Sequence, residues 1–359
     1  MSDRTSTEHL AELPAGGSAD AVSSGGGGGG GDRESASPLR YLRKLDRYKH
    51  ISGLIAALIL LCILLHILSP YFLTVSNFYN ILLQASNLAV VSAGLTVVIL
   101  VGEIDLSVGS VEALVGAVAA ILIIKTGIPV VPGVILALLA AVVVGLVNAF
   151  LTTKLRVVSF IATLAMLGVA QGLAFIMTDG QAIEGFPSSF EKIGTATIGA
   201  GGFPVPAVIA IVVIVLIYLL LAHTKLGLHM FAVGGSRQAA TFAGISPARI
   251  KTIAFVICAV CSGIGGLILS SRLNAGNGLF GQGDLLNAVA AVVIGGASLS
   301  GGMGSVGGTT VGVLIIATIE DGLVLLNVPD FWQQVVVGGF IVGAVMMDQI
   351  AKGMGRTDE

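Results

Sequence analysis

Charged residues are scarce in this sequence. Asp, Glu, Lys and Arg make up 11% of its 359 residues, whereas apolar residues make up 55%. A soluble protein of ordinary composition has about 25% charged residues. Because apolar runs recur along most of the chain, the composition excludes a soluble domain with a single membrane anchor. It predicts an all-α, polytopic integral membrane protein.

Cysteine is rare, and the chain has no net positive charge. Only Cys62, Cys258 and Cys261 occur, and all three lie in apolar segments. No extracellular disulfide framework is therefore expected. The formal net charge of -2 provides no domain-scale basic surface. The sequence thus argues against a nucleic-acid partner and leaves the lipid bilayer as the expected surroundings.

The amino-terminal region has few apolar side chains. Residues 1 to about 38 are rich in Ser, Gly, Glu and Ala and include the glycine run Gly25–Gly31. Such a segment buries too little apolar surface to offset its ordering entropy. We expect residues 1–48 to form a disordered cytoplasmic tail, residues 49–351 the transmembrane domain, and residues 352–359 a short cytoplasmic tail.

About ten apolar segments follow the tail. Most have the roughly 17 to 25 residues that cross a hydrocarbon core as a helix. The third and eighth are shorter, which predicts half-helices or re-entrant pieces covered by protein. The segments cover residues 51–68, 85–101, 111–125, 134–151, 160–177, 205–222, 251–271, 285–296, 306–326 and 331–350.

The positions of Lys and Arg orient these segments. If the amino terminus is cytoplasmic and all ten segments cross, only Lys125, Lys192 and Arg272 of the 18 basic residues fall outside the cell. Cytoplasmic loops carry such an excess of Lys and Arg. We therefore expect both termini in the cytoplasm.

Two similar glycine-rich motifs follow apolar runs. Gly102–Gly109 reads GEIDLSVG and Gly295–Gly302 reads GGASLSGG, with Ser107 and Ser300 at matching places. Paired interruptions in two halves of a chain indicate the central site of a transporter, where unwound backbone supplies polar groups at mid-depth.

The acidic residues of the first motif have two interpretations. A carboxylate at the bilayer centre costs about 2.5 to 3.5 kcal/mol, so such residues usually mark a pathway or have a partner. Asp105 also suits the cap of a helix that begins near Ser107, since it can accept freed backbone N–H groups. Glu103 has no helix end to cap, so a pathway role and a membrane-boundary position both stay open.

A second acidic pair, Glu320 and Asp321, stands inside an apolar stretch just before Gly322. At least one of the two is expected to face a polar interior. Either acidic pair could relay protons, which keeps an ion-coupled secondary sugar carrier as an alternative function. A membrane enzyme is not expected, because no histidine or metal-ligand arrangement surrounds a candidate nucleophile.

A loop at about residues 223–250 separates the sixth and seventh segments. It contains SRQAATFAGI, Ser236–Ile245, a helix-compatible piece followed by Pro247. A small helix along the cytoplasmic surface with Ala-rich contact positions suits the docking of a soluble partner. An ordinary connecting loop is the alternative.

This loop and two longer motifs resemble the permease subunits of binding-protein-dependent ABC importers. Gln238-Ala239-Ala240 with Gly244 is similar to their EAAxxxG coupling motif, with Gln in place of Glu. GEIDLSVGS and the block Ala291–Pro329 resemble the permeases for ribose, xylose and arabinose.

Two further motifs narrow the resemblance, which spans about Leu54 to Asp348. GLILSSRL (Gly266–Leu273) and VPDFWQ (Val328–Gln333) are most similar to the D-xylose permeases. The resemblance implies import of a monosaccharide, a pentose such as xylose or ribose, across the bacterial inner membrane. Transport makes no covalent change to the sugar, so no catalytic residue, metal or cofactor is expected in this chain.

The resemblance also implies partners. They are a second copy of this subunit, a cytoplasmic ATP-binding subunit and a periplasmic sugar-binding protein. The chain has no GxxxxGK[ST] loop, so ATP must be bound by the partner subunit. The residues expected to couple to that subunit are Ser236, Arg237, Gln238, Ala239, Ala240, Gly244 and Ile245.

The substrate pathway needs polar side chains, because each sugar hydroxyl left unpaired costs about 1 to 3 kcal/mol. Candidates are chosen for polarity or stacking near apolar segments. They are Asn87, Glu103, Asp105, Ser107, Asn148, Gln171, Asn274, Asn277, Phe280, Asn287, Ser300, Glu320 and Asp321.

Overall fold

A computed structural model describes residues 38–199 and 202–329, with residues 332–336, 338–339, 342–343 and 346 beyond them. Side chains are described from Ile51 onward. A compact unit starts at Leu45. The last predicted segment, residues 331–350, lies only in part within the described residues, and most of the predicted tail lies outside them.

The described chain is almost entirely helical. Its helices are α1 Pro38–Leu68, α2 Val75–Leu100, α3 Val108–Ala120 with its π-helical extension η1 Ile121–Lys125, α4 Val130–Thr153, α5 Ser159–Thr178, α6 Ser188–Thr195, α7 Val205–His223, α8 Lys225–Gly235, α9 Arg237–Phe242, α10 Pro247–Leu273, α11 Asp284–Ile294 and α12 Val306–Leu325. Two antiparallel pairs of two-residue strands join β1 Ile183–Glu184 to β4 Ala275–Gly276, and β2 Thr197–Ile198 to β3 Phe203–Pro204.

Eight of the described helices are long and apolar enough to cross a membrane. The eighth predicted segment corresponds to α11, which has only 11 residues and is too short to cross, as expected. The third segment, in contrast, reaches 18 residues because η1 continues α3. The helix α1 starts at Pro38, before the predicted start of the membrane domain.

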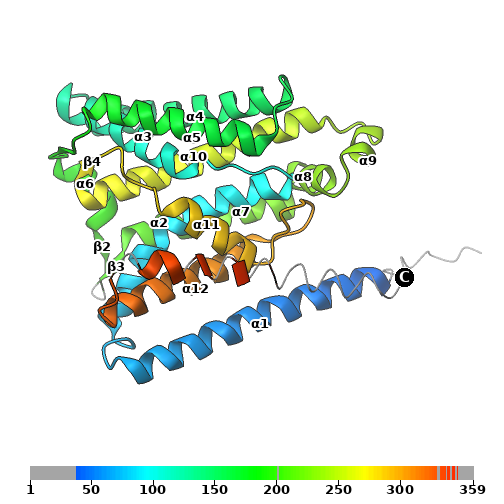
Figure 1. Cartoon of the computed structure of the whole chain (residues 1–359), viewed down its shortest axis with the longest axis horizontal. Helices are drawn as coiled ribbons and strands as arrows, with labels where there is room; N and C mark the ends of the chain where they lie inside the picture. Colours follow the sequence, from blue (N-terminus) through cyan, green and yellow to red (C-terminus); the bar gives the residue numbers. More distant parts are fainter. Residues whose placement is uncertain are drawn as a thin grey trace, which may run out of the picture. The chain divides into compact units, whose positions relative to one another are not determined.

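Helices α2, α3, α10 and α12 form the interior of the bundle (Figure 1). In the 18-residue apolar stretch of α2, 83% of the residues are buried, whereas in that of α1 only 6% are. Helices α1, α4, α5 and α7 expose apolar side chains such as Ile59, Leu139 and Ile176. An exposed apolar surface of this extent suits lipid, which is why the outer helices are apolar on every face.

Small residues let the interior helices approach closely. Helix α10 contacts α2, α3 and α4. A Cβ added at Gly266 of α10 would lie 2.7 Å from the Cα of Glu112 in α3, and one at Gly145 of α4 would lie 2.9 Å from the Cα of Val256 in α10. Tight backbone packing of this kind holds helices together where burial from water does not.

Candidate functional site

The segment between α2 and α3, residues 101–107, is the first interruption of the helical pattern. Gly102 has a left-handed backbone, with φ of 76°, and ends α2. The Oδ1 atom of Asp105 accepts the backbone N–H of Ser107 at 2.8 Å and its hydroxyl at 2.6 Å. The side chain of Asp105 is 1% exposed. Asp105 therefore holds the turn that leads into α3. The N-cap residue of α3 is Ser107, and among the described residues no side chain caps the helix. The predicted capping of α3 by Asp105 is thus wrong, because Asp105 bonds the residue before the helix and not the N–H groups of its first turn.

The hydrogen bonds of this turn continue into α4. The Nδ2 atom of Asn148 donates to the Ser107 hydroxyl at 2.9 Å, and both residues are fully buried. Three candidate residues thus form one hydrogen-bonded chain from Asn148 through Ser107 to Asp105. The Oδ1 atom of Asn148 is buried without a hydrogen-bond partner among the described residues.

Glu103 in the same segment forms an ion pair with Lys251, in the second turn of α10. Both side chains are largely covered, with 12% and 10% exposure respectively. Lys251 was expected only as one of the basic residues on the cytoplasmic side. Its pairing with Glu103 was not predicted, because 148 residues separate the two in the chain.

A second polar group lies deeper in the bundle. The Nδ2 atom of Asn87 in α2 is 2.6 Å from Oδ2 of Asp284, the first residue of α11, and 3.5 Å from Oε2 of Glu112 in α3. The Nδ2 atom of Asn287, one turn along α11, donates to Oε1 of Glu320 in α12 at 2.7 Å. We call these five residues the amide–acid cluster.

The amide–acid cluster lies beside a close backbone contact between the start of α3 and the loop before α11. Gly109 in the first turn of α3 lies against Gly281, which precedes α11 and has φ of 73°. A Cβ at Gly281 would lie 2.8 Å from Oε2 of Glu112. Sequence reasoning missed Glu112 and Asp284, although each is an acid beside an apolar run, the signal that singled out Glu320.

The other candidates contact their own surroundings. Asp321 accepts from Nδ2 of Asn77 at 2.7 Å, which ties α12 to the start of α2. The Gln171 amide donates to the Gly278 carbonyl at 2.9 Å. Asn274 accepts from the Phe186 N–H and Asn277 from the Leu279 N–H. Phe280 is half-buried and Ser300 is exposed.

The predicted surface helix is α9, Arg237–Phe242. The Ser236 hydroxyl accepts the Ala239 N–H at 3.2 Å and caps it, while Gly244, with φ of 77°, ends it. Ala240 is buried, whereas Phe242 is 91% exposed. Sequence reasoning named the small residues of this helix and passed over Phe242, the large apolar side chain that it presents.

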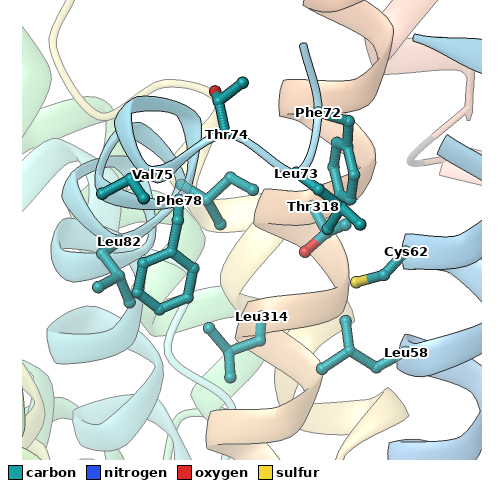
Figure 2. Close-up of a pocket in the computed structure, with 11 residues that line it drawn as sticks. Leu58, Cys62, Phe72, Leu73, Thr74, Val75, Phe78, Leu82, Leu314 and Thr318 are labelled. Carbon is teal, nitrogen blue, oxygen red and sulfur yellow. The ribbon is translucent and has the colours of Figure 1, made fainter. Parts of the chain in front are cut away.

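An apolar pocket of about 380 Å³ lies between α1, α2 and α12 (Figure 2). Leu58 and Cys62 of α1 face Leu314 and Thr318 of α12 across it. Its lining includes no amide or carboxylate side chain. A sugar held there would leave most hydroxyl groups unpaired, so this pocket is unsuited to a polar substrate.

Comparison with known proteins places these features in a family. The family described as branched-chain amino acid transport system / permease component matches residues 77–345. The chain is 40% identical to the ribose import permease protein of Bacillus subtilis (strain 168) over 300 residues, which cover 83% of this chain and 92% of that protein.

Two other relatives are similar over comparable lengths. The ribose import permease protein of Escherichia coli (strain K12) is 39% identical over 88% of this chain and 98% of its own length. The L-arabinose ABC transporter permease protein of Azospirillum brasilense is 37% identical over 85% of this chain and 89% of its own. No solved structure matches the chain.

Proposed function

The chain belongs to the family of branched-chain amino acid transport system permease components, and from this premise we propose how it works. It is the permease subunit of an ABC importer for a monosaccharide, and it forms the pathway through which a separate ATPase subunit drives the sugar. The arrangement that carries this proposal is the amide–acid cluster inside the bundle, held by α2, α3, α11 and α12, with the exposed helix α9 at one end of the same bundle.

The proposed substrate is a pentose such as ribose or xylose. Relatives that cover most of the chain are named for ribose and L-arabinose, and another for D-allose. The motifs Gly266–Leu273 and Val328–Gln333 favour xylose. Competition of unlabelled ribose, xylose, arabinose and allose against uptake of a labelled pentose would rank these sugars.

In the proposed assembly, two copies of the chain lie together in the bacterial inner membrane, and both termini of each copy are cytoplasmic. The ATP-binding subunit docks at α9, and the sugar-binding protein delivers its cargo at the opposite end, where α6 lies. A second copy is supported by the outward face of α5, where Gly168 and Gly172 have open space around them and form the small-xxx-small spacing that packs membrane helices.

Phe242 is proposed as the anchor for the ATP-binding subunit. Phe242→Ala is expected to weaken the complex of the two subunits by about 2 kcal/mol, because a buried aromatic side chain at the centre of an interface contributes that much. Tyr71→Ala is the control, since Tyr71 is an aromatic residue 70% exposed in the turn between α1 and α2, away from α9. Affinity measured in detergent micelles checks this, and equal losses in the two variants would reject the anchor.

Of the candidates, the partly covered polar side chains on α11 and α12 suit the sugar pathway best. Asn287 and Glu320 are half-buried and bond each other, whereas Asp105, Ser107, Asn148 and Asp321 are fully buried among protein partners. A sugar moving past α11 can exchange hydrogen bonds with the Asn287–Glu320 pair at each step, and weak, multiple contacts of this kind permit release.

Asn287→Ala is therefore expected to lower kcat/KM for sugar uptake about tenfold, the effect of losing one hydrogen bond to a charged partner or sugar hydroxyl. Gln181→Ala is the matched control, because Gln181 carries an exposed amide in the turn after α5. Initial rates of labelled sugar uptake measure the difference. A rate in Asn287→Ala equal to that of the control variant would place the pathway elsewhere.

Uptake in cells separates the ABC importer from the ion-coupled carrier. We expect uptake to disappear when the ATP-binding subunit is deleted, and to continue for a short time when a protonophore collapses the proton gradient while ATP stays intact. Immediate loss of uptake with the protonophore, together with normal uptake in the deletion strain, would instead support the carrier.

A further inference from the structure

The segment Leu100–Glu103, which ends α2, lies between the two stems of the loop that carries α9. One stem is α8, which ends at Gly235, and the other is α10, which begins at Pro247. The two stems contact this segment by different means. We call Leu100–Glu103 the receiver segment.

The α8 stem contacts the receiver segment through backbone. A Cβ at Gly234 would overlap the carbonyl oxygen of Leu100 and would lie 2.5 Å from the Gly302 nitrogen. The Leu100 carbonyl also accepts the N–H of Gly302 at 2.9 Å. Only glycine allows such an approach of backbones. The adjacent Gly235, in contrast, has open space where its Cβ would lie.

The loop between α11 and α12 joins the same contact. A Cβ at Gly301, whose φ is 86°, would lie 2.7 Å from the Gly102 Cα and 3.0 Å from the Gly234 carbonyl oxygen. Three chain segments therefore meet backbone to backbone: the end of α2, the end of α8 and the loop before α12. Because no side chain lies between them, a shift of one is passed directly to the others.

The α10 stem contacts the receiver segment through charge. Lys251 and Glu103 form their ion pair with both side chains largely shielded from water. Separating the two side chains of a shielded ion pair would leave each charge uncompensated. We therefore expect Glu103 and Lys251 to stay together when α10 moves. The receiver segment is thus attached to both sides of α9.

Helix α2 connects the receiver segment to the amide–acid cluster. Asn87 lies 13 residues before Leu100 on the same uninterrupted helix, a distance of about 20 Å at 1.5 Å per residue. On the other side, the chain from Glu103 leads through the turn held by Asp105 and Ser107 into α3, which carries Glu112. Movement of the receiver segment therefore reaches two helices of the cluster.

We infer that the receiver segment transmits the movement of α9 to the transport pathway, and that Glu103, Lys251 and Gly234 are positioning residues for this coupling. Glu103 acts in this role through Lys251 and makes no contact with the sugar. The inference rests on the proposed function, because it requires an ATPase subunit that moves α9.

The test uses the full complex of this chain, the ATP-binding subunit and the sugar-binding protein in proteoliposomes, with labelled pentose and phosphate release followed together. Gly234→Ala is expected to retain ATP hydrolysis while the sugar transported per ATP falls about tenfold, a typical coupling effect. Gly235→Ala, one residue away, is expected to match the wild type. Equal ratios in the two variants would overturn the inference.

The ion pair provides a second test that does not depend on packing. Glu103→Gln and Lys251→Gln are each expected to lower the sugar-to-ATP ratio, and Glu103→Lys combined with Lys251→Glu is expected to restore part of it. A raised KM with an unchanged ratio in Glu103→Gln would make Glu103 a pathway residue and overturn the inference. Absence of ATP-dependent uptake in the wild-type complex would instead reject the proposed function itself.

Discussion

Asp105→Ala is expected to lower the free energy of unfolding by about 3 kcal/mol and to reduce the amount of folded protein in the membrane. The substitution leaves the N–H and the hydroxyl of buried Ser107 without their acceptor. Each buried donor left unpaired costs about 1 to 3 kcal/mol. Thermal unfolding of the purified chain in detergent micelles measures the loss.

Asp105→Asn is the matched variant, because asparagine keeps an Oδ1 acceptor in the same place. We expect it to retain at least half of the stability that alanine loses, since the acceptor remains but its charge does not. If Asp105 instead contacts sugar, both variants would lose uptake while unfolding at the wild-type temperature, and the structural role of Asp105 as the acceptor for Ser107 would be rejected.

Gly281→Ala is expected to destabilise the protein by about 2 to 4 kcal/mol and to abolish uptake. Gly281 has φ of 73°, a backbone conformation that costs a residue with a side chain about 1 to 3 kcal/mol. Its new methyl group would also lie 2.5 Å from the Gly109 carbonyl oxygen and 2.8 Å from Oε2 of Glu112. Either the start of α11 or the start of α3 must shift, and both carry members of the amide–acid cluster.

Gly283→Ala, two residues away, isolates this effect. Gly283 is exposed, has φ of -77° and has open space where a Cβ would lie. We expect its stability within about 0.5 kcal/mol of the wild type, because alanine adopts this conformation without strain and restricts the unfolded chain. Unfolding temperatures and uptake rates compared side by side measure both variants. A Gly281→Ala protein as stable and active as Gly283→Ala would show that the start of α3 and the loop before α11 do not need to touch.

The apolar runs were enough to predict the helical membrane architecture, because a run of this length has few other stable structures in lipid. Predicted ends were less accurate. Helix α2 starts at Val75, before the predicted residue 85, since its first turns include Ser76, Asn77 and Asn80 and lack the apolar run. There the Thr74 hydroxyl accepts the Asn77 N–H and starts the helix.

The paired motifs were found from sequence, but their contacts were not. Glycine and serine at similar places in two segments indicate that both helices break. They do not indicate that Gly102 meets Gly301, or that Gly234 of a third segment lies against Leu100. Such contacts depend on how helices pack, and no local pattern encodes that packing.

The polar residues were predicted unevenly for the same reason. Asp105 has a local partner two residues away, so a role next to the start of α3 was readable from spacing, although Asp105 bonds Ser107 and not the first turn of the helix. Glu103 and Asn87 have partners 148 and 197 residues away, and those partners become visible only when the helices are assembled. Glu112 lies inside an apolar run and is fully buried. Its neighbour Asn87 is on another helix, so the sequence around Glu112 did not indicate why an acid stands there.

The most direct test of the account uses sealed vesicles that contain this chain with its ATPase subunit, with the sugar-binding protein and labelled pentose on the side where α6 lies. The account predicts that sugar accumulates on the α9 side above its outside concentration only when ATP is supplied on that side. Vesicles that hold this chain alone, and concentrate the sugar when a proton gradient is imposed without ATP, would contradict it.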